Sequence, residues 1–219
     1  MLHLDWGVVV KKYWNVIFSV IFSLFIILGV VRFTIGFKEL YYFDIGYLDI
    51  PSMIGLPEEE IKLNYDYVID YNFSKEPPEF NMPTIKSSPE GQIHFEEVRE
   101  IFRNVDKFFV VCMIVSVIGL VINIKEKHFE FLKTTSKLII TIPLVLSLPV
   151  IIDFNKSFII FHKLLFDNDY WIFDPNKDPV IKMLPEEFFF HAGIIILVLI
   201  LLASIISYST YKLLKRKKA

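Results

Sequence analysis

Four long apolar runs divide this chain, and charged, aromatic segments separate them. The runs contain no Asp, Glu, Lys or Arg; they are Tyr13–Val31, Phe108–Ile124, Leu138–Ile152 and Phe188–Tyr208. Because a membrane-spanning helix needs about 17–25 apolar residues, three of the runs reach that length directly. The third is shorter, so we expect its helix to begin near Phe131, with flanking lysines reaching the interface.

The composition is typical of a polytopic membrane protein. Hydrophobic residues make up 54% of the chain, and its mean hydropathy is +0.50. Lys11 and Lys12 precede the first run as in a signal peptide, but no Ala-x-Ala-like cleavage site follows, which favours a retained anchor. The predicted fold class is an α-helical polytopic membrane protein with four transmembrane helices and a small extracellular cap of mixed structure.

The distribution of basic residues sets the expected orientation. Residues 124–137 carry four lysines against two glutamates, and the tail 211–219 carries five basic residues and no acid. Residues 37–103 carry six basic against 14 acidic residues, and residues 153–190 carry four against seven. We therefore expect both termini in the cytoplasm and the two acidic segments outside the cell.

The predicted boundaries follow from these two patterns. They are a cytoplasmic N-terminus (1–12), transmembrane helix 1 (13–35), an extracellular cap (36–103), transmembrane helix 2 (104–124), a cytoplasmic loop (125–131), transmembrane helix 3 (132–153), a second extracellular segment with an interfacial helix (154–187), transmembrane helix 4 (188–210) and a basic cytoplasmic tail (211–219).

The cap is expected to place a histidine on an apolar helical face. Its sequence begins with a turn-rich aromatic stretch, continues with an amphipathic helix that starts at Pro57, and then favours short strands around Phe80 and Ile85. His94 follows in a helix that we expect to continue into the second span. It shares one face with Val98, Ile101, Phe102 and Val105.

The second extracellular segment shows the same feature. His162 shares a helical face with Phe158, Phe161, Leu165 and Phe166. Asn155 or Ser157 is the predicted N-cap of this short helix. Because a short loop joins spans 2 and 3, these spans are expected to be antiparallel neighbours, which would bring the two histidine segments together.

Several classes of site are excluded or unsupported. The sequence has no Gly-x-Ser-x-Gly elbow, P-loop, dinucleotide fingerprint or His-Glu-x-x-His motif. The sole cysteine, Cys112, lies within a span and is expected to pack as a small apolar residue. Nothing in the sequence supports binding to nucleic acid.

The residues alone leave the role of the histidines open. A histidine on an apolar interfacial face is more often a packing residue than a catalyst. A metal site built from His94, His162, His191 and an external carboxylate is a further alternative, although no ligand-spacing motif supports it.

Two longer segments resemble the lipoprotein intramolecular transacylases of Gram-positive bacteria. The segments are GQIHFEEVREIF and FHKLLFDNDYWIFDPNKDPVIKMLPEEFFF, and LNYDYVIDY also resembles that family's cap. The resemblance implies acyl transfer from the sn-2 glyceryl ester of a diacylglyceryl lipoprotein to the α-amine of its N-terminal cysteine. It implies His94 and His162 as the catalytic residues, with no cofactor and no metal.

Such a reaction needs no nucleophile from the protein, because the substrate's own amine attacks. Attack closes an eight-membered ring, which requires close positioning of the reacting groups. The expected substrate-binding residues are Asn64, Tyr65, Tyr67, Tyr170, Trp171 and Phe173. His94 is the first candidate for the base and His162 for the acid or oxyanion stabiliser, and the reverse assignment is the alternative.

The expected partners are the lipoprotein substrate and membrane lipid, with no obligatory protein partner. Two rival hypotheses remain from the residues alone. One is a non-enzymatic membrane subunit with an acidic cap that binds a protein partner, and the other is a metal-dependent membrane hydrolase.

Overall fold

Four of the helices are long and apolar enough to cross a membrane. They appear in the computed structural model, which describes residues 6–76 and 79–217, with side chains described from residue 13 onward. The helices of the described residues are α1 (Trp6–Gly36), α2 (Lys38–Tyr47), α3 (Ile50–Ile54), α4 (Glu58–Phe73), α5 (Pro89–Lys125), α6 (Glu130–Ile152), α7 (Phe154–Leu165), α8 (Val180–Met183) and α9 (Glu186–Arg216). The predicted four-span α-helical fold is confirmed, with α1, α5, α6 and α9 as the spans.

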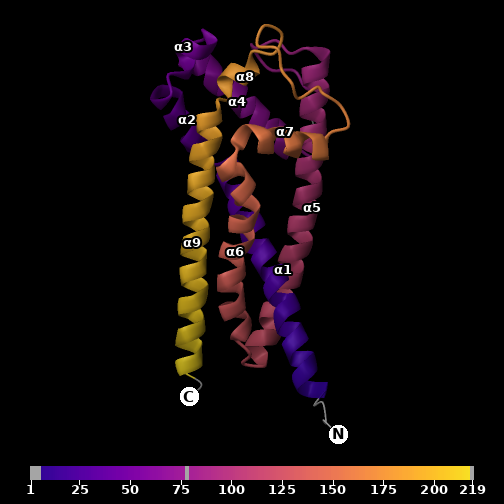
Figure 1. Ribbon diagram of the computed structural model, residues 1–219, viewed down its shortest axis with the longest axis vertical. Helices are drawn as coiled ribbons and strands as arrows, with labels where there is room; N and C mark the ends of the chain where they lie inside the picture. The colour runs from indigo at the N-terminus through magenta and orange to yellow at the C-terminus, as the bar shows by residue number, and fades with distance from the viewer. Residues whose placement is uncertain (1–5, 77–78, 218–219) are drawn as a thin grey trace. The chain divides into compact units, whose positions relative to one another are not determined.

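The chain forms two compact units, and the spanning helices contribute to both. The first unit comprises residues 1–31, 107–148 and 196–219, and the second comprises residues 32–106 and 149–195. In the first unit, the first turn of α1, the connection between α5 and α6, and the last turn of α9 lie at the same end (Figure 1).

Small polar side chains pack the helices of the first unit against one another. Ser204 Oγ donates a hydrogen bond of 2.7 Å to the carbonyl of Ser136, which joins α9 to α6, and Ser19 Oγ lies 3.2 Å from the carbonyl of Phe131, which joins α1 to α6. Such residues allow close helix approach and satisfy their own polar groups in an apolar surrounding. Gly119 of α5 also allows close helix approach, because any Cβ at this position would overlap the buried ring of Phe18 in α1.

Aromatic stacking organises the core of the second unit. Tyr41 of α2 stacks on Tyr65 of α4, with ring centroids 3.7 Å apart, and Phe188 of α9 meets both rings edge-on. Tyr41 also donates a hydrogen bond of 2.7 Å to the carbonyl of Met183 in α8. Offset and edge-on pairs of this kind add to the free energy gained from burial, so they fix α2 and α4 within the unit.

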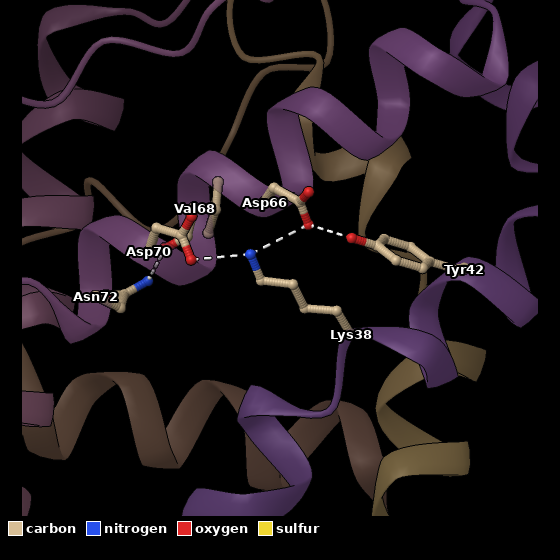
Figure 2. Close-up of polar contacts among 6 residues, drawn as sticks. All are labelled: Lys38, Tyr42, Asp66, Val68, Asp70 and Asn72. Atoms are coloured by element: carbon tan, nitrogen blue, oxygen red, sulfur yellow. Dashed lines mark hydrogen bonds and ion pairs between the residues drawn. The ribbon is translucent and has the colours of Figure 1, made fainter.

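A polar cluster joins α2 and α4 at their surface (Figure 2). Lys38 Nζ lies 2.8 Å from an oxygen of Asp70 and 3.3 Å from an oxygen of Asp66, and Tyr42 donates a hydrogen bond of 2.6 Å to Asp66. Burial, followed by this bond to a carboxylate, raises the pKa of Tyr42 to about 12. The tyrosine therefore remains a donor over the physiological range.

Three local predictions about the two segments that were expected to be extracellular are wrong. The stretch predicted to be turn-rich forms α2 and α3, because its aromatic and aliphatic side chains are buried against α4 and α8. Around Phe80 and Ile85 the described residues form no strand; both side chains instead fill the core from an extended loop. The N-cap of α7 is Asp153, whose carboxylate accepts a hydrogen bond of 3.0 Å from the backbone N–H of Lys156.

Candidate active site

His94 lies in the second turn of α5 and is 6% exposed. Its ring is enclosed by aromatic side chains, with centroids 4.8 Å from Phe166, 5.3 Å from Phe173 and 5.9 Å from Phe95. Its Nδ1 is buried and has no hydrogen-bond partner among the described residues. Burial, and then the nearby charge of His162, lowers the pKa of His94 to about 4, so this imidazole is neutral at physiological pH.

His162 lies near the end of α7, where it is partly exposed. Its Nδ1 is 2.8 Å from the backbone carbonyl oxygen of Phe158, one turn earlier. A carbonyl oxygen only accepts hydrogen bonds, so Nδ1 carries the hydrogen. In the neutral ring the lone pair is therefore on Nε2.

The structure brings the two imidazoles together. Their centroids are 6.1 Å apart and their planes are tilted by 32°. Phe166 contacts both rings, at 4.8 Å from His94 and 5.7 Å from His162, and Trp171 lies 4.8 Å from His162. The two histidines, which lie 68 positions apart in the sequence and on different helices, thus contact the same ring of Phe166.

Two of the six predicted substrate-binding residues lie beside the histidine pair. Trp171 is 7% exposed and faces His162, and Phe173 packs edge-on against His94. Tyr170 is adjacent in sequence but is 38% exposed, and its backbone N–H donates a hydrogen bond to Asn168.

The other three predicted binding residues lie within the core of the second unit. Asn64 is fully buried: its Nδ2 donates to the carbonyl of Glu60 and to Thr84, and its Oδ1 accepts from the backbone N–H groups of Thr84 and Ile85. This side chain therefore holds the loop after α4, with both donors engaged. Tyr65 is stacked on Tyr41, and Tyr67 accepts a hydrogen bond from the backbone N–H of Asn81.

Sequence reasoning left three aromatic residues out of the predicted site: Phe95, Phe158 and Phe166. Phe158 lies closest to a catalytic candidate, with its ring 3.9 Å from His162. Phe158 and Phe166 are the i−4 and i+4 neighbours of His162, so helical spacing contained the signal. Phe95 follows His94 directly and stacks on Phe173 at 5.9 Å, a contact that only the tertiary structure reveals.

His191, the third histidine considered for a metal site, has a different partner. Its Nδ1 lies 2.8 Å from a carboxylate oxygen of Asp44, a residue of α2 that is completely buried. Over the described part of the chain, no group of three or more His, Cys, Asp or Glu side chains is arranged to hold a metal ion.

An acidic cavity opens on the α5 surface of the second unit. Its volume is about 410 Å³. It is lined by Tyr71, Glu79, Ile93, Glu96, Glu97, Arg99 and Glu100. Glu97 also lies three residues after His94, on the same side of α5.

The fold and the histidine pair define a four-span integral membrane protein with an imidazole site enclosed by aromatic rings. The family model for the lipoprotein intramolecular transacylase Lit matches residues 16–189. The chain therefore belongs to the lipoprotein intramolecular transacylase family, and it is an acyltransferase. This membership decides against the two rival hypotheses, the non-enzymatic subunit and the metal-dependent hydrolase.

Solved structures agree with this assignment. The chain is 41% identical to the membrane integral lipoprotein intramolecular transacylase Lit from Bacillus cereus, with a TM-score of 0.90 over 95% of this chain and 97% of that one. Two further structures of the Bacillus cereus protein, in which a histidine is replaced by alanine or by arginine, are each 39% identical, with TM-scores of 0.91 and 0.85. They cover 99% and 97% of this chain, and 99% and 96% of their own. No curated protein matches the chain.

Proposed function

We propose that the chain moves an acyl group from the sn-2 glyceryl ester of a diacylglyceryl lipoprotein to the α-amine of the same molecule's N-terminal cysteine. The observation that carries this proposal is the pair of imidazoles 6.1 Å apart in an aromatic enclosure. The reaction needs proton transfers and charge stabilisation but no nucleophile from the protein. Two histidines supply both requirements.

His162 is the general base in this proposal. Its Nδ1–H donates to Phe158, so the free lone pair on Nε2 is available to take a proton. The α-ammonium of a peptide has a pKa of about 7.7–8.0, so it must lose a proton before the amine can attack, and Nε2 of His162 is the acceptor. An imidazole whose pKa is about 4 is a poor acceptor for this proton, which argues against His94 as the base.

His94 stabilises the oxyanion. As a neutral imidazole it retains one N–H, which can donate to the oxygen that becomes negative when the amine attacks the ester. A neutral histidine used as an electrophile in this way is an established pattern in enzymes. This assignment reverses the first choice made from the sequence and rests on the tautomer of His162 and the burial of His94.

The ammonium loses two protons as it becomes an amide N–H, and the departing glyceryl oxygen gains one. His162 passes the first proton to solvent and transfers the second from the attacking nitrogen to the leaving oxygen.

The ring formed on attack contains eight atoms: N, Cα, Cβ, S, two glyceryl carbons, the ester oxygen and the carbonyl carbon. Trp171 and Phe173 are the proposed walls that favour this folded conformation of the substrate.

The proposed orientation places both termini in the cytoplasm and the second unit outside the cell. It is supported by the basic residues in the tail and in the 125–131 loop, which share one end of the first unit (Figure 1). Single cysteines in a Cys112→Ser background provide the test. Lys217→Cys should resist a membrane-impermeant maleimide in intact cells, and Asn176→Cys should react; the opposite pattern would reverse the topology.

Histidine variants test the catalytic assignment. We expect His94→Ala and His162→Ala each to lower conversion of diacyl to lyso-form lipoprotein by at least about 100-fold. His128→Ala is the matched control, since His128 lies in the connection between α5 and α6, and it should retain full activity. Membrane insertion and thermal stability of each variant are measured in parallel. Full activity in a stable His162→Ala or His94→Ala protein would refute the assignment.

A further inference from the structure

Asn168 is the centre of a hydrogen-bond network beside the histidine pair. Its Nδ2 donates to Oε1 of Glu97 at 2.7 Å, and its Oδ1 accepts from the backbone N–H of Tyr170 at 3.0 Å. Its backbone carbonyl accepts from Nε1 of Trp171 at 3.0 Å. A backbone N–H can only donate, so the orientation of the Asn168 amide is determined and its NH₂ group must face the carboxylate.

This network connects the elements that carry the two histidines. Glu97 is one turn after His94 on α5. Trp171, at the other end of the network, is 7% exposed and lies 4.8 Å from the ring of His162, with an interplanar angle of 33°. The path from α5 to α7 therefore runs through Glu97, Asn168 and Trp171.

A second attachment holds the far end of the same loop. Asp178 is 4% exposed and accepts hydrogen bonds of 2.8 Å from both the backbone N–H and the hydroxyl of Ser88, immediately before α5. The loop between Asn168 and Asp178 is thus tied to α5 on both sides of His94 along the helix. Only the attachment at Asn168 also contacts the tryptophan beside His162.

We propose that Glu97 and Asn168 form a positioning pair that holds Trp171 against His162 and so sets the placement of the base relative to His94. The inference rests on the proposed function. Neither residue takes part in proton transfer. A charge-assisted bond of 2.7 Å is shorter and stronger than a neutral one, which suits it to hold a loop in one position.

The expected kinetic effect follows from the sensitivity of such reactions to position. A displacement of about 1 Å costs roughly 100-fold in rate, so we expect Asn168→Ala and Glu97→Ala each to lower the first-order conversion rate by roughly 10- to 100-fold, with KM nearly unchanged. Because they act as one pair, the double variant should lose no more than the worse single variant. Glu97→Gln keeps an acceptor oxygen and should stay within about threefold of the wild type.

Asn176→Ala is the matched control. Asn176 lies in the same loop, its side chain is exposed, and its backbone N–H makes the local hydrogen bond to Asp174. This variant should convert substrate at the wild-type rate.

Tryptophan fluorescence gives a readout that does not depend on activity. The chain has three tryptophans, so a Trp6→Phe, Trp14→Phe background leaves Trp171 as the sole fluorophore. In that background Asn168→Ala should shift the emission to longer wavelength and raise quenching by acrylamide, while the protein remains folded by thermal unfolding.

The outcomes are distinguishable. Wild-type conversion by Asn168→Ala, unchanged Trp171 emission, or losses that multiply in the double variant would each overturn the positioning pair. A wild-type protein that makes no lyso-form would instead overturn the proposed function, and the emission change would still report on the pair.

Discussion

Replacing Phe166 by alanine tests whether the aromatic enclosure sets the pKa of His94. The Phe166 side chain is 7% exposed, and its ring lies 4.8 Å from His94 and 5.7 Å from His162. Burial is the largest cause of the low pKa of His94. Removing this ring admits water to the imidazole, so we expect the pKa of His94 to rise from about 4 toward its ordinary value of 6.5.

The magnitude follows from the linkage between pKa and free energy. Complete loss of the effect would correspond to about 3.4 kcal/mol at about 1.36 kcal/mol per pH unit. Because Phe173 and His162 remain in place, we expect a rise of at least about one unit, or roughly 1.4 kcal/mol. In the wild type, the unfolded chain binds a proton at His94 between pH 6.5 and 4 and the folded chain does not. Folding stability from this group therefore falls as the pH decreases through that window, and the variant should show a smaller fall.

Nuclear magnetic resonance of ¹³C- and ¹⁵N-labelled histidine in lipid nanodiscs measures the titration directly, with His94 assigned by its alanine variant. Phe161→Ala is the matched control, because Phe161 lies on α7, the helix that ends just before Phe166, is 57% exposed and contacts His162 at 5.6 Å. It should leave the pKa of His94 unchanged. A folded Phe166→Ala protein in which His94 still titrates near pH 4 would refute the argument that the enclosure lowers this pKa.

Three further predictions concern the stability of the fold. Gly119→Ala should lower the free energy of unfolding by about 1–3 kcal/mol, measured by denaturant unfolding in detergent, because the new methyl group meets the buried ring of Phe18; wild-type stability would show that this ring can move. Asn64→Ala should cost at least about 2 kcal/mol by the same assay, since it leaves two backbone N–H groups without their acceptor, and an equally stable variant would contradict the role given to Asn64. Asp153→Ala should accelerate hydrogen exchange in the first turn of α7 by an amount equivalent to about 1 kcal/mol, and unchanged exchange would show that the cap is dispensable.

Three of the spans were predictable because each contains an uncharged apolar run long enough to cross a bilayer. The third run is shorter, and its helix was predictable only by extending it past the flanking lysines toward Phe131. The continuation of the His94 helix into the second span also followed from its spacing. The helices α2 and α3 were not predictable from local sequence, because aromatic residues and turn formers dominate it. Burial of Tyr41 and Ile45 against α4 stabilises the helical form there.

The site was predictable in part. Both histidines lie on apolar faces of their helices, and the resemblance to the transacylase family singled them out, but only the tertiary structure gives their separation. The structure gives Asn64 a buried position in which it holds the loop after α4, and local sequence does not predict this, because a buried amide that holds a loop and an amide that binds a substrate have the same sequence signature. The bond between Glu97 and Asn168 joins residues 71 positions apart, and neither stands out in the sequence.

A crossover experiment tests the central claim, that the acyl group moves within one lipoprotein molecule. An intramolecular shift from oxygen to nitrogen leaves the intact mass of the lipoprotein unchanged, so fragmentation must locate the chain. The purified protein is given a mixture of two diacylglyceryl lipopeptides, one with a deuterated sn-2 acyl chain and the other with a ¹⁵N-labelled peptide. We expect tandem mass spectrometry to find N-acyl products in which each peptide retains its own acyl chain. Deuterated chains on ¹⁵N-labelled peptide, or products that have lost the mass of an acyl group, would contradict it.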